Sequence, residues 1–392
     1  MILLNDDTSL EALPFRVAFI ADIHFGALPS DQLFFQLKER FLKVLEKNPV
    51  DMLVFGGDLF HNIITMNYST SHVVLMFMES VIELCRQYNI LYVRIIQGTI
   101  SHDNNQLHNF HMFENREDID FRIIMNVEEE YFSSHDINVL YLPEEYMKDP
   151  KEYYAPYLDN ADKKYDFIFG HGMVREVAFV AKSQESENTM SKAPIFESKQ
   201  LINACKGPIF FGHIHIRTTI RDHLYYSGSF SRWRFGEEDP KGWYLCLYEP
   251  NTGKYLNKFI ENDLASEYIT VSVELTETFA KHPELIEKTL KQIIADHIRL
   301  RLEVGDADSS FAIKYLTDTY GKGSSVKIDI KNKEKEMAEE HENEIMEQLK
   351  DKYGFVFDES LTLAEVIQKF IKAKKDKDTP IEVIEDELTG LK

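Results

Sequence analysis

Residues 16–26, RVAFIADIHFG, contain the pattern that decides the fold. The apolar run 17–20 is typical of a buried strand, and Asp22 and His24 follow it closely. Because successive residues of an extended chain point to opposite faces, a carboxylate and an imidazole two positions apart point the same way and can bind one cation. The pattern alone is a weak signal, since a strand-end turn with a capping aspartate has the same sequence.

The same arrangement recurs after four further apolar runs. An amphipathic helical pattern at 33–45 separates the first run from the second, which predicts a layered α/β domain with ligands gathered beyond the carboxyl ends of its strands. Several coincident strand ends in this order argue for a shared site. The four runs, 52–55, 91–96, 165–169 and 209–211, lead to Gly57-Asp58, His102-Asp103, Gly170-His171 and Gly212-His213-Ile214-His215.

Composition narrows the class of protein. The chain has 392 residues, 44% of them hydrophobic, which is enough for two or three folded units. A formal charge of -22 repels polyanions, so binding of nucleic acid would need metal ions, a basic groove or a partner. The widely spaced cysteines, the lack of a signal-peptide pattern and the lack of a membrane-spanning apolar stretch predict a cytoplasmic protein without a membrane association.

The residue types at the strand ends indicate metal chemistry. Carboxylates and imidazoles without thiolates suit manganese, iron or zinc. The donors exceed what one catalytic ion needs, which predicts two ions with Asp58 as the shared carboxylate. Such a pair activates water and binds the attacking and leaving oxygens of a phosphoryl displacement, and His102 is placed to protonate the leaving oxygen.

These motifs, in this order, resemble those of the calcineurin-like metallophosphoesterase superfamily over about residues 15–250. Two further stretches, Gly57-Asp58-Leu59-Phe60-His61 and Tyr226-Ser227-Gly228-Ser229-Phe230-Ser231-Arg232, resemble the SbcD-type DNA repair nucleases and their bacteriophage counterparts. The resemblance implies a layered β-sandwich flanked by helices and two Mn²⁺ ions, with Mg²⁺ as a substitute. It assigns the metal ligands as Asp22, His24, Asp58, His171, His213 and His215.

The resemblance also implies roles for residues outside the ligand set. His102 would be the catalytic histidine, and His61 would lie beside the scissile phosphate and favour exonucleolytic attack; a polar residue at a helix entry is the alternative for His61. Arg232, in the second motif, is a predicted nucleic-acid contact. One departure concerns Ser101, which stands where the family has an asparagine that binds the second metal. A hydroxyl is a poorer electron-pair donor to a metal ion than an amide oxygen, so we expect the second ion to bind more weakly.

The remaining chain predicts two further regions after a nuclease domain at 1–262. Alternating strand and helix patterns over 263–332 indicate a small α/β capping domain, in which Arg299 and Arg301 share a strand face and either meet phosphates or provide solubilising charge. Residues 333–392 contain a mixed-charge linker and an apolar helical stripe at 363–371. By the resemblance, this segment binds the coiled-coil base of an SbcC-like ABC ATPase; docking on its own capping domain is the alternative.

The sequence therefore predicts a manganese-dependent DNA nuclease, with exonuclease and endonuclease activity, in an SbcCD-like repair and recombination complex. The resemblance implies a homodimer, in the host cytoplasm if a phage encodes it. Two alternatives remain open: a phosphomonoesterase or protein phosphatase with the same metals, and a catalytically weakened scaffold subunit.

Overall fold

The structure is a computed structural model that describes residues 14–63, 68–114, 116–160, 164–177, 193–304, 309–321 and 325–332. The chain divides into two compact units. Of the described residues, the first comprises those up to Ile269 together with Ala295–His297, and the second comprises those in Thr270–Ile294 and those from Ile298 to Asn332. The predicted linker and partner-binding segment, 333–392, lies outside the described residues.

Two six-stranded sheets form the centre of the first unit. In the first sheet the order is β14 (Lys254–Glu261), β13 (Gly242–Glu249), β1 (Phe15–Ile20), β2 (Met52–Phe55), β3 (Tyr92–Ile96) and β4 (Asp120–Ile124). In the second sheet it is β11 (Thr218–Ile220), β12 (Leu224–Tyr226), β10 (Ile209–Gly212), β7 (Phe167–His171), β6 (Ile137–Leu142) and β5 (Glu128–Phe132). Strands β1 to β4 run parallel, as do β6, β7, β10 and β12.

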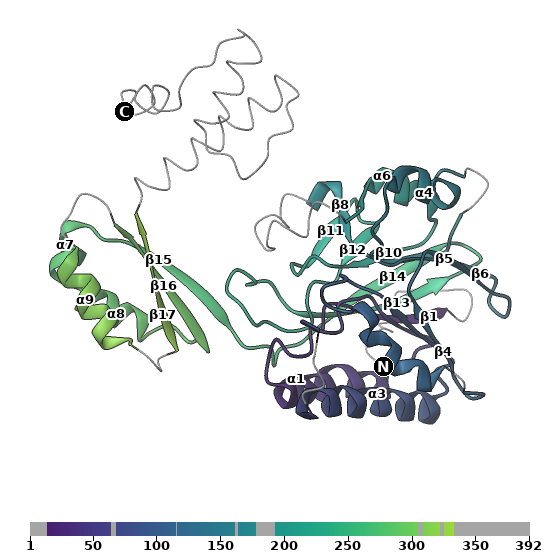
Figure 1. Cartoon of the computed structure of the whole chain (residues 1–392), viewed down its shortest axis with the longest axis horizontal. Helices are drawn as coiled ribbons and strands as arrows, with labels where there is room; N and C mark the ends of the chain where they lie inside the picture. Colours follow the sequence, from purple (N-terminus) through teal and green to yellow (C-terminus); the bar gives the residue numbers. More distant parts are fainter. Residues whose placement is uncertain are drawn as a thin grey trace, which may run out of the picture. The chain divides into compact units, whose positions relative to one another are not determined.

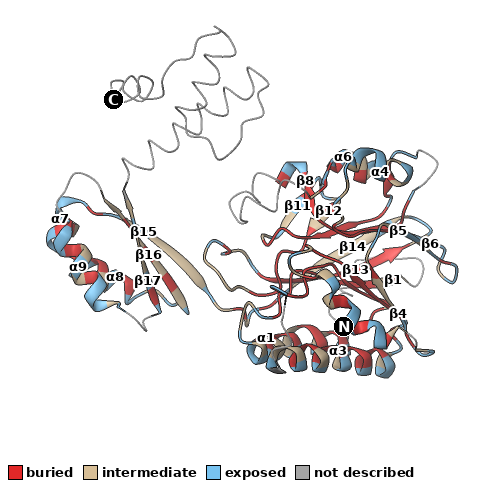
Figure 2. Cartoon of the chain, in the orientation of Figure 1, coloured by how far each residue is buried: buried red, intermediate tan, exposed pale blue. Residues whose placement is uncertain are grey.

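Helices cover the outer faces of both sheets, so that the first unit has four layers (Figure 1). One apolar core lies between the sheets, and two others lie between each sheet and its helices (Figure 2). The helical segments are α1 (Ser30–Leu37), η1 (Lys38–Leu42), α2 (Lys43–Lys47), α3 (Tyr68–Tyr88), η2 (Asn104–Phe113), α4 (Pro150–Leu158), η3 (Arg175–Val177) and α6 (Ser198–Ala204). A short parallel pair, β8 (Met173–Val174) and β9 (Ile195–Phe196), completes the unit.

The central strands are apolar along their length because both faces are covered. Strands β2, β7 and β10 are buried at every residue. Since β1, β2 and β3 are parallel neighbours, their carboxyl ends meet at one edge of the first sheet, and those of β6, β7 and β10 meet at one edge of the second. The polar residues that follow these strands are thereby brought together.

The second unit is a small α/β unit with a three-stranded sheet. Its elements are β15 (Tyr268–Glu274), α7 (Glu277–Lys281), α8 (Glu284–Leu290), β16 (His297–Val304), α9 (Ser310–Thr319) and β17 (Val326–Asn332). The predicted layered α/β class is confirmed, and strands alternate with helices in this unit. Burial alternates along β16, so Ile298 and Leu300 face the interior while Arg299 and Arg301 share the other face.

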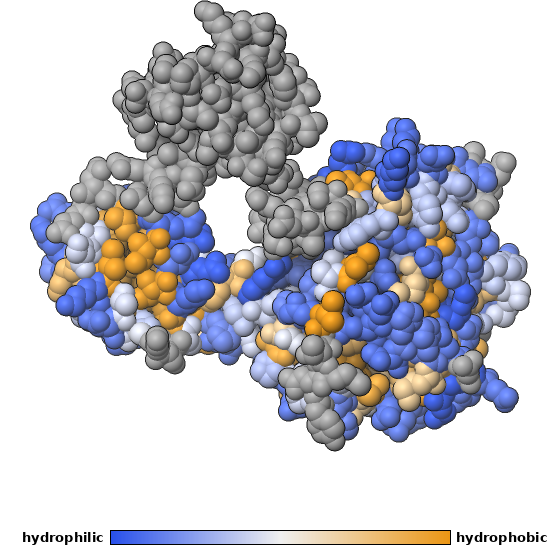
Figure 3. Space-filling model, in the orientation of Figure 1, coloured by the Kyte–Doolittle hydropathy of each residue, from blue (hydrophilic) through white to orange (hydrophobic). Residues whose placement is uncertain are grey.

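The surface differs between the two units. Hydrophilic side chains cover most of the visible face of the first unit, whereas apolar side chains gather on the second (Figure 3). Large apolar side chains of the second unit that are exposed include Leu285, Ile294, Phe311 and Ile330. Among the residues that the structure describes, no helix combines the length and apolarity needed to cross a bilayer.

Candidate metal centre

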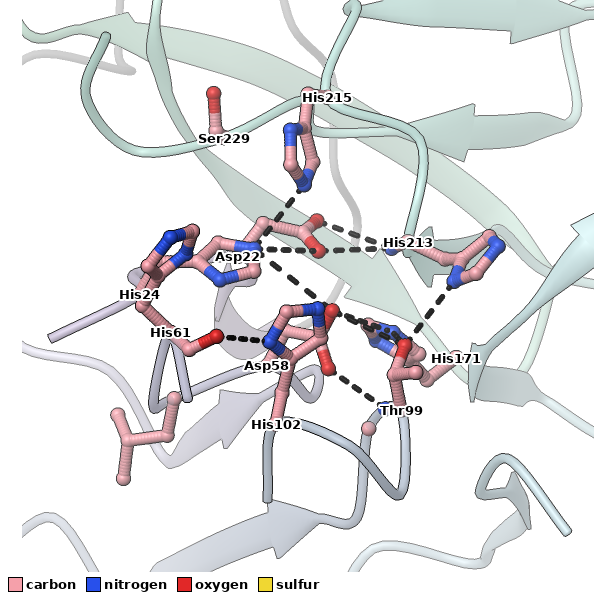
Figure 4. A network of polar contacts seen from close by, with 12 residues as sticks. Asp22, His24, Asp58, His61, Thr99, His102, His171, His213, His215 and Ser229 are labelled. Carbon is pink, nitrogen blue, oxygen red and sulfur yellow. Dashed lines mark hydrogen bonds and ion pairs between the residues drawn. The ribbon is translucent and has the colours of Figure 1, made fainter. Parts of the chain in front are cut away.

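The polar residues that follow the strands of both sheets converge on one buried region (Figure 4). Backbone hydrogen bonds join the segments after β1 and β2: the amide of Asp22 donates to Gly57 O at 3.0 Å, and the amide of His24 donates to Asp58 O at 3.0 Å. From the second sheet, the amide of His213 donates to both oxygens of the Asp22 carboxylate, at 3.0 and 3.1 Å. The two sheets are therefore fastened together at the predicted site.

Within this region, the six predicted ligands form two groups of three. In each group the ligating atoms lie within 4.8 Å of one another, and all six residues are buried. We refer to Asp22, His24 and His215 as the first triad, and to Asp58, His171 and His213 as the second triad.

The Asp58 carboxylate lies within reach of both triads. Its Oδ2 atom is 3.7 Å from His24 Nε2 and 3.3 Å from His171 Nε2. The amide of Thr99 donates to its other oxygen at 2.6 Å, which fixes the orientation of the carboxylate. Asp58, the carboxylate predicted to be shared by two cations, therefore lies within 4 Å of a histidine of each triad.

The imidazoles of the first triad face each other in a way that suits a cation. The Nε2 atoms of His24 and His215 are 3.1 Å apart, and His24 Nδ1 is buried without a hydrogen-bond partner among the described residues. Burial, with help from nearby His215, lowers the pKa of His24 well below its usual value, which keeps it neutral and able to bind metal. Glu237 contacts His215 Nδ1 at 2.9 Å, an outer partner that directs Nε2 toward the centre.

Asp22 and Asp58 are buried carboxylates, and their negative charge is stable in the protein interior only beside a positive charge. Burial raises the pKa of Asp22 to about 6, although His171 and His215 oppose the shift. For Asp58, burial acts in the same direction, but the charge and hydrogen bond of His171 outweigh it and hold the pKa well below its usual range. Asp58 in turn raises the pKa of His171 well above the ordinary value. A bound divalent cation would supply this charge instead of a protonated imidazole.

Several site residues have a backbone conformation that L-residues rarely adopt. A left-handed backbone costs roughly 1–3 kcal/mol at a non-glycine residue and is found most often at functional sites. Together with the donor chemistry, this strain identifies the region as the candidate functional site. The φ angles are 51° at Asp22, 52° at His24, 51° at Asp58 and 93° at His213.

Two glycines permit the close approach of the strand ends. Gly57 has a φ of 92°, and a Cβ atom there would lie 2.2 Å from His171 Nδ1. A Cβ atom at Gly98 would lie 2.2 Å from the amide nitrogen of Asp58. Any side chain at either position would therefore displace a residue of the second triad.

Ser101, which the resemblance implies as a ligand of the second metal ion, lies at an exposed position, whereas the six other predicted ligands are buried. Residues 99–103 form a tight turn in which the amides of His102 and Asp103 both donate to Thr99 O at 2.9 Å. This turn directs Ser101 outward, where it is exposed. The hydroxyl that enters the site belongs to Thr99, whose Oγ1 lies 3.2 Å from Asp58 Oδ2.

His61 and His102, to which the resemblance gives roles in catalysis, lie at the edge of the first triad. Their ligating atoms come within 4.8 Å of each other and of His24. The ring centroids of His24 and His102 are 4.9 Å apart, and His102 Nδ1 is hydrogen-bonded to the backbone oxygen of His61. Both histidines are partly exposed, unlike the six residues of the triads.

Besides Thr99 and Glu237, three further residues lie at the site without a role predicted from the sequence. Asp103 accepts hydrogen bonds from the amides of Gly98 and Asp58, and Glu144 lies 3.2 Å from His213 Nδ1. The signal for Glu144 was present, because it closely follows strand β6. Trp233, whose ring centroid is 4.7 Å from that of His24, sits in a loop where no periodic pattern marks it.

The arginines predicted to contact nucleic acid have other partners. Arg232, a predicted nucleic-acid contact, donates to the backbone oxygens of Glu237 at 2.8 Å and Asp239 at 2.7 Å, so its guanidinium stabilises a loop. In the second unit, Arg301 contacts Asp329 at 3.3 Å, and Arg299 lies on the same face of β16.

No protein-family profile and no curated protein matches this sequence. Among solved structures, a dimetal phosphatase from Danio rerio aligns over 64% of this chain and 97% of its own, at 8% identity and a TM-score of 0.36. A nuclease, MPE, from Pseudomonas putida aligns over 62% of this chain and 87% of its own, at 12% identity and a TM-score of 0.26. A cold-active protein-tyrosine phosphatase from a Shewanella species aligns over 64% and 81%, at 13% identity and a TM-score of 0.28. Because these similarities are weak, we infer the chemistry of the site from the residues of this chain alone.

Proposed function

We propose that this chain is a metal-dependent phosphodiesterase that hydrolyses DNA. The observation that carries the proposal is the position of Asp58, which lies 3.7 Å from His24 Nε2 and 3.3 Å from His171 Nε2, between two triads of carboxylate and imidazole donors. This donor set suits Mn²⁺, with Mg²⁺ as a substitute. Two such ions, when bound, supply a water of lowered pKa and neutralise charge on the phosphoryl oxygens.

His102 is suited to move a proton at the leaving oxygen. Its Nδ1 atom is hydrogen-bonded to the His61 carbonyl, which can only accept, so Nδ1 carries a proton. The Nε2 atom is then the one that exchanges a proton with the substrate. Because the ring stands against His24, that exchange would occur beside the first triad.

Trp233 favours a nucleic-acid substrate over a small phosphomonoester. Its half-buried ring lies against His24 and His215, with centroid distances of 4.7 and 5.0 Å. An aromatic face beside a phosphate-binding site can stack on a nucleobase or a sugar, and stacking of this kind tolerates any sequence. His61, whose ring centroid is 5.9 Å from that of Trp233, would contact the same nucleotide.

The negative charge of the chain favours a function together with a partner protein that binds DNA. A formal charge of -22 opposes DNA binding at long range, and neither Arg232 nor Arg301 offers a guanidinium without an acceptor. An SbcC-like coiled-coil ATPase bound through residues 333–392 would supply the missing affinity, in a complex with a homodimer of this chain. Alone, the chain would degrade DNA slowly.

The test measures hydrolysis of linear DNA, hairpin DNA and p-nitrophenyl phosphate by the purified chain, with and without Mn²⁺. We expect slow, Mn²⁺-dependent cleavage of both DNA substrates that is lost in Asp58→Asn. Addition of the partner ATPase should increase the rate. Hydrolysis of the phosphomonoester without cleavage of DNA, at any enzyme concentration, would refute the nuclease function.

A further inference from the structure

A buried carboxylate outside the two triads lies against the second triad. Glu144 is 1% exposed, and its Oε2 atom is 3.2 Å from His213 Nδ1 and 3.4 Å from Thr99 Oγ1. It closely follows β6, the strand that runs parallel to β7, and so it reaches the same sheet edge as His171. Topology and side-chain direction both bring Glu144 to the metal centre.

The spacing between donors indicates that Glu144 shares a cation with the second triad. Metal–ligand distances of about 2.0–2.2 Å at angles between about 90° and 109° place neighbouring donors about 2.8–3.6 Å apart. The pair Glu144 Oε2 and His213 Nδ1, at 3.2 Å, and the pair Asp58 Oδ2 and His171 Nε2, at 3.3 Å, both have this separation. The ring nitrogen of His213 that faces Thr99 is the same Nδ1 atom (Figure 4).

Thr99 links these donors but adds no charge to them. Its Oγ1 atom lies 3.2 Å from Asp58 Oδ2, 3.5 Å from His171 Nε2 and 3.4 Å from His213 Nδ1. A hydroxyl is a weak ligand for a divalent cation compared with a carboxylate. The second triad therefore needs a stronger oxygen donor than Thr99 provides.

The number of carboxylates in each triad also points to Glu144. The first triad has Asp22 as its own carboxylate and can share Asp58, whereas the second triad has only the shared Asp58. With Glu144 included, each cation would have one carboxylate of its own and one in common. The two sites would then balance the charge of two divalent ions equally.

Glu144 is held in position by contacts that leave Oε2 directed at the site. Its Oε1 atom accepts the Tyr146 hydroxyl at 2.9 Å. Its amide donates to Gln97 O at 3.2 Å, and Gln97 Nε2 donates to its carbonyl at 3.1 Å. Because Gln97 immediately precedes Gly98 and Thr99, these bonds fix Glu144 to the turn that enters the second triad.

We propose that Glu144 is a ligand of the second metal ion, and that it completes a site in which Thr99 offers only a hydroxyl. This inference rests on the proposed metal-dependent function. It concerns this chain's own donor set and predicts a second ion held by two carboxylates and two imidazoles.

The test is the Mn²⁺ stoichiometry and affinity of the full chain by titration calorimetry, with metal content checked after gel filtration. Wild type should bind two ions. Glu144→Gln keeps the shape and a hydrogen-bond acceptor but removes the charge, and we expect it to retain one ion while the second binds at least tenfold more weakly. Glu145→Gln is the matched control, because Glu145 bonds to Val127 N and the Tyr153 hydroxyl instead of the triads. Circular dichroism verifies that each variant is folded.

The outcomes separate this inference from the proposed function. Two ions in wild type with unchanged affinity in Glu144→Gln would overturn the role of Glu144 and leave the dinuclear centre intact. No bound ion in wild type would overturn both. A crystal of the unaltered chain soaked in MnCl₂ gives an independent answer: an anomalous peak bonded to Glu144 Oε2 supports the inference, and a peak bonded to Asp58 and His171 but not to Glu144 refutes it.

Discussion

The carboxylate of Asp103 accepts the backbone amide of Asp58 at 3.0 Å, so one aspartate holds the turn that presents another to the metal centre. The same carboxylate accepts the amides of Gly98 at 2.8 Å, Leu59 at 3.0 Å and Phe60 at 3.2 Å. Asp103 is fully buried, and its bonds are all directed at the turns that follow β2 and β3. It organises the second triad without belonging to it.

Asp103→Asn should destabilise the chain and weaken metal binding together. An asparagine has one acceptor oxygen and turns an NH₂ group toward backbone donors, which leaves buried amides unpaired at a cost of about 2–4 kcal/mol. We expect the unfolding midpoint in urea to fall accordingly, and Mn²⁺ affinity to fall with it. The exposed Asp31→Asn is the control; equal stability of the two variants would contradict the role given to Asp103.

Asp22 should make the metal-free chain less stable as the pH rises. Its pKa of about 6 in the folded chain exceeds the usual 3.8, so the folded state binds more protons between these values and loses stability as the pH rises through them. The difference corresponds to about 3 kcal/mol. Metal-free Asp22→Asn should therefore unfold at a higher temperature than wild type at pH 7.5, with the advantage narrowing toward pH 5.

Differential scanning calorimetry of metal-free protein between pH 5 and 8 checks this effect. Added Mn²⁺ should reverse the ranking, because it stabilises wild type and has little effect on Asp22→Asn. If the two proteins had the same pH profile without metal, the raised pKa of Asp22 would be incorrect.

Trp233→Ala should impair DNA cleavage more than cleavage of a small diester. Loss of stacking on a base costs about 1–3 kcal/mol, so KM for DNA should rise about tenfold or more. Turnover of bis-p-nitrophenyl phosphate, which has no base to stack, should change little. Trp233→Phe keeps an aromatic face and serves as the control. An equal loss on both substrates would show instead that Trp233 acts by positioning His24 and His215.

His102→Gln should reduce kcat without reducing metal content. Removal of a group that transfers a proton in the transition state lowers the rate about 10²- to 10⁴-fold. Since His102 lies at the edge of the first triad and is not needed to complete it, Mn²⁺ stoichiometry should stay at the wild-type value. Loss of an ion from this variant would identify His102 as a ligand and exclude the proton-transfer role.

The sequence was a good guide wherever a residue lies beside the end of a buried strand. Asp22, Asp58, His171 and His213 follow or end apolar runs, and the parallel pairing of those runs forces their side chains together. The layered fold was predictable for the same reason, since runs buried on both faces need helices outside them. In these cases the apolar pattern of the sequence predicts both the strand and the sheet edge at which its last residues lie.

The sequence does not reveal which side chain of a tight turn lies beside the site. Thr99 and Ser101 are both hydroxyl residues in one loop, and only the hydrogen bonds from His102 and Asp103 to Thr99 O determine that Thr99 faces the site. Spacing relative to His102 favoured Ser101. The role of Arg232 depends in the same way on the path of a loop, because its partners are backbone oxygens that no side-chain pattern reveals.

Each triad takes donors from both sheets: Asp22 and His24 follow β1 and join His215 after β10, while Asp58 follows β2 and joins His171 and His213. A pair of bound cations would thus link the two sheets, because each ion would be held by residues from both. Under metal starvation the halves would separate more readily and expose their shared interior to proteases. The lifetime of this polypeptide in the presence of proteases would then follow the supply of divalent metal ions.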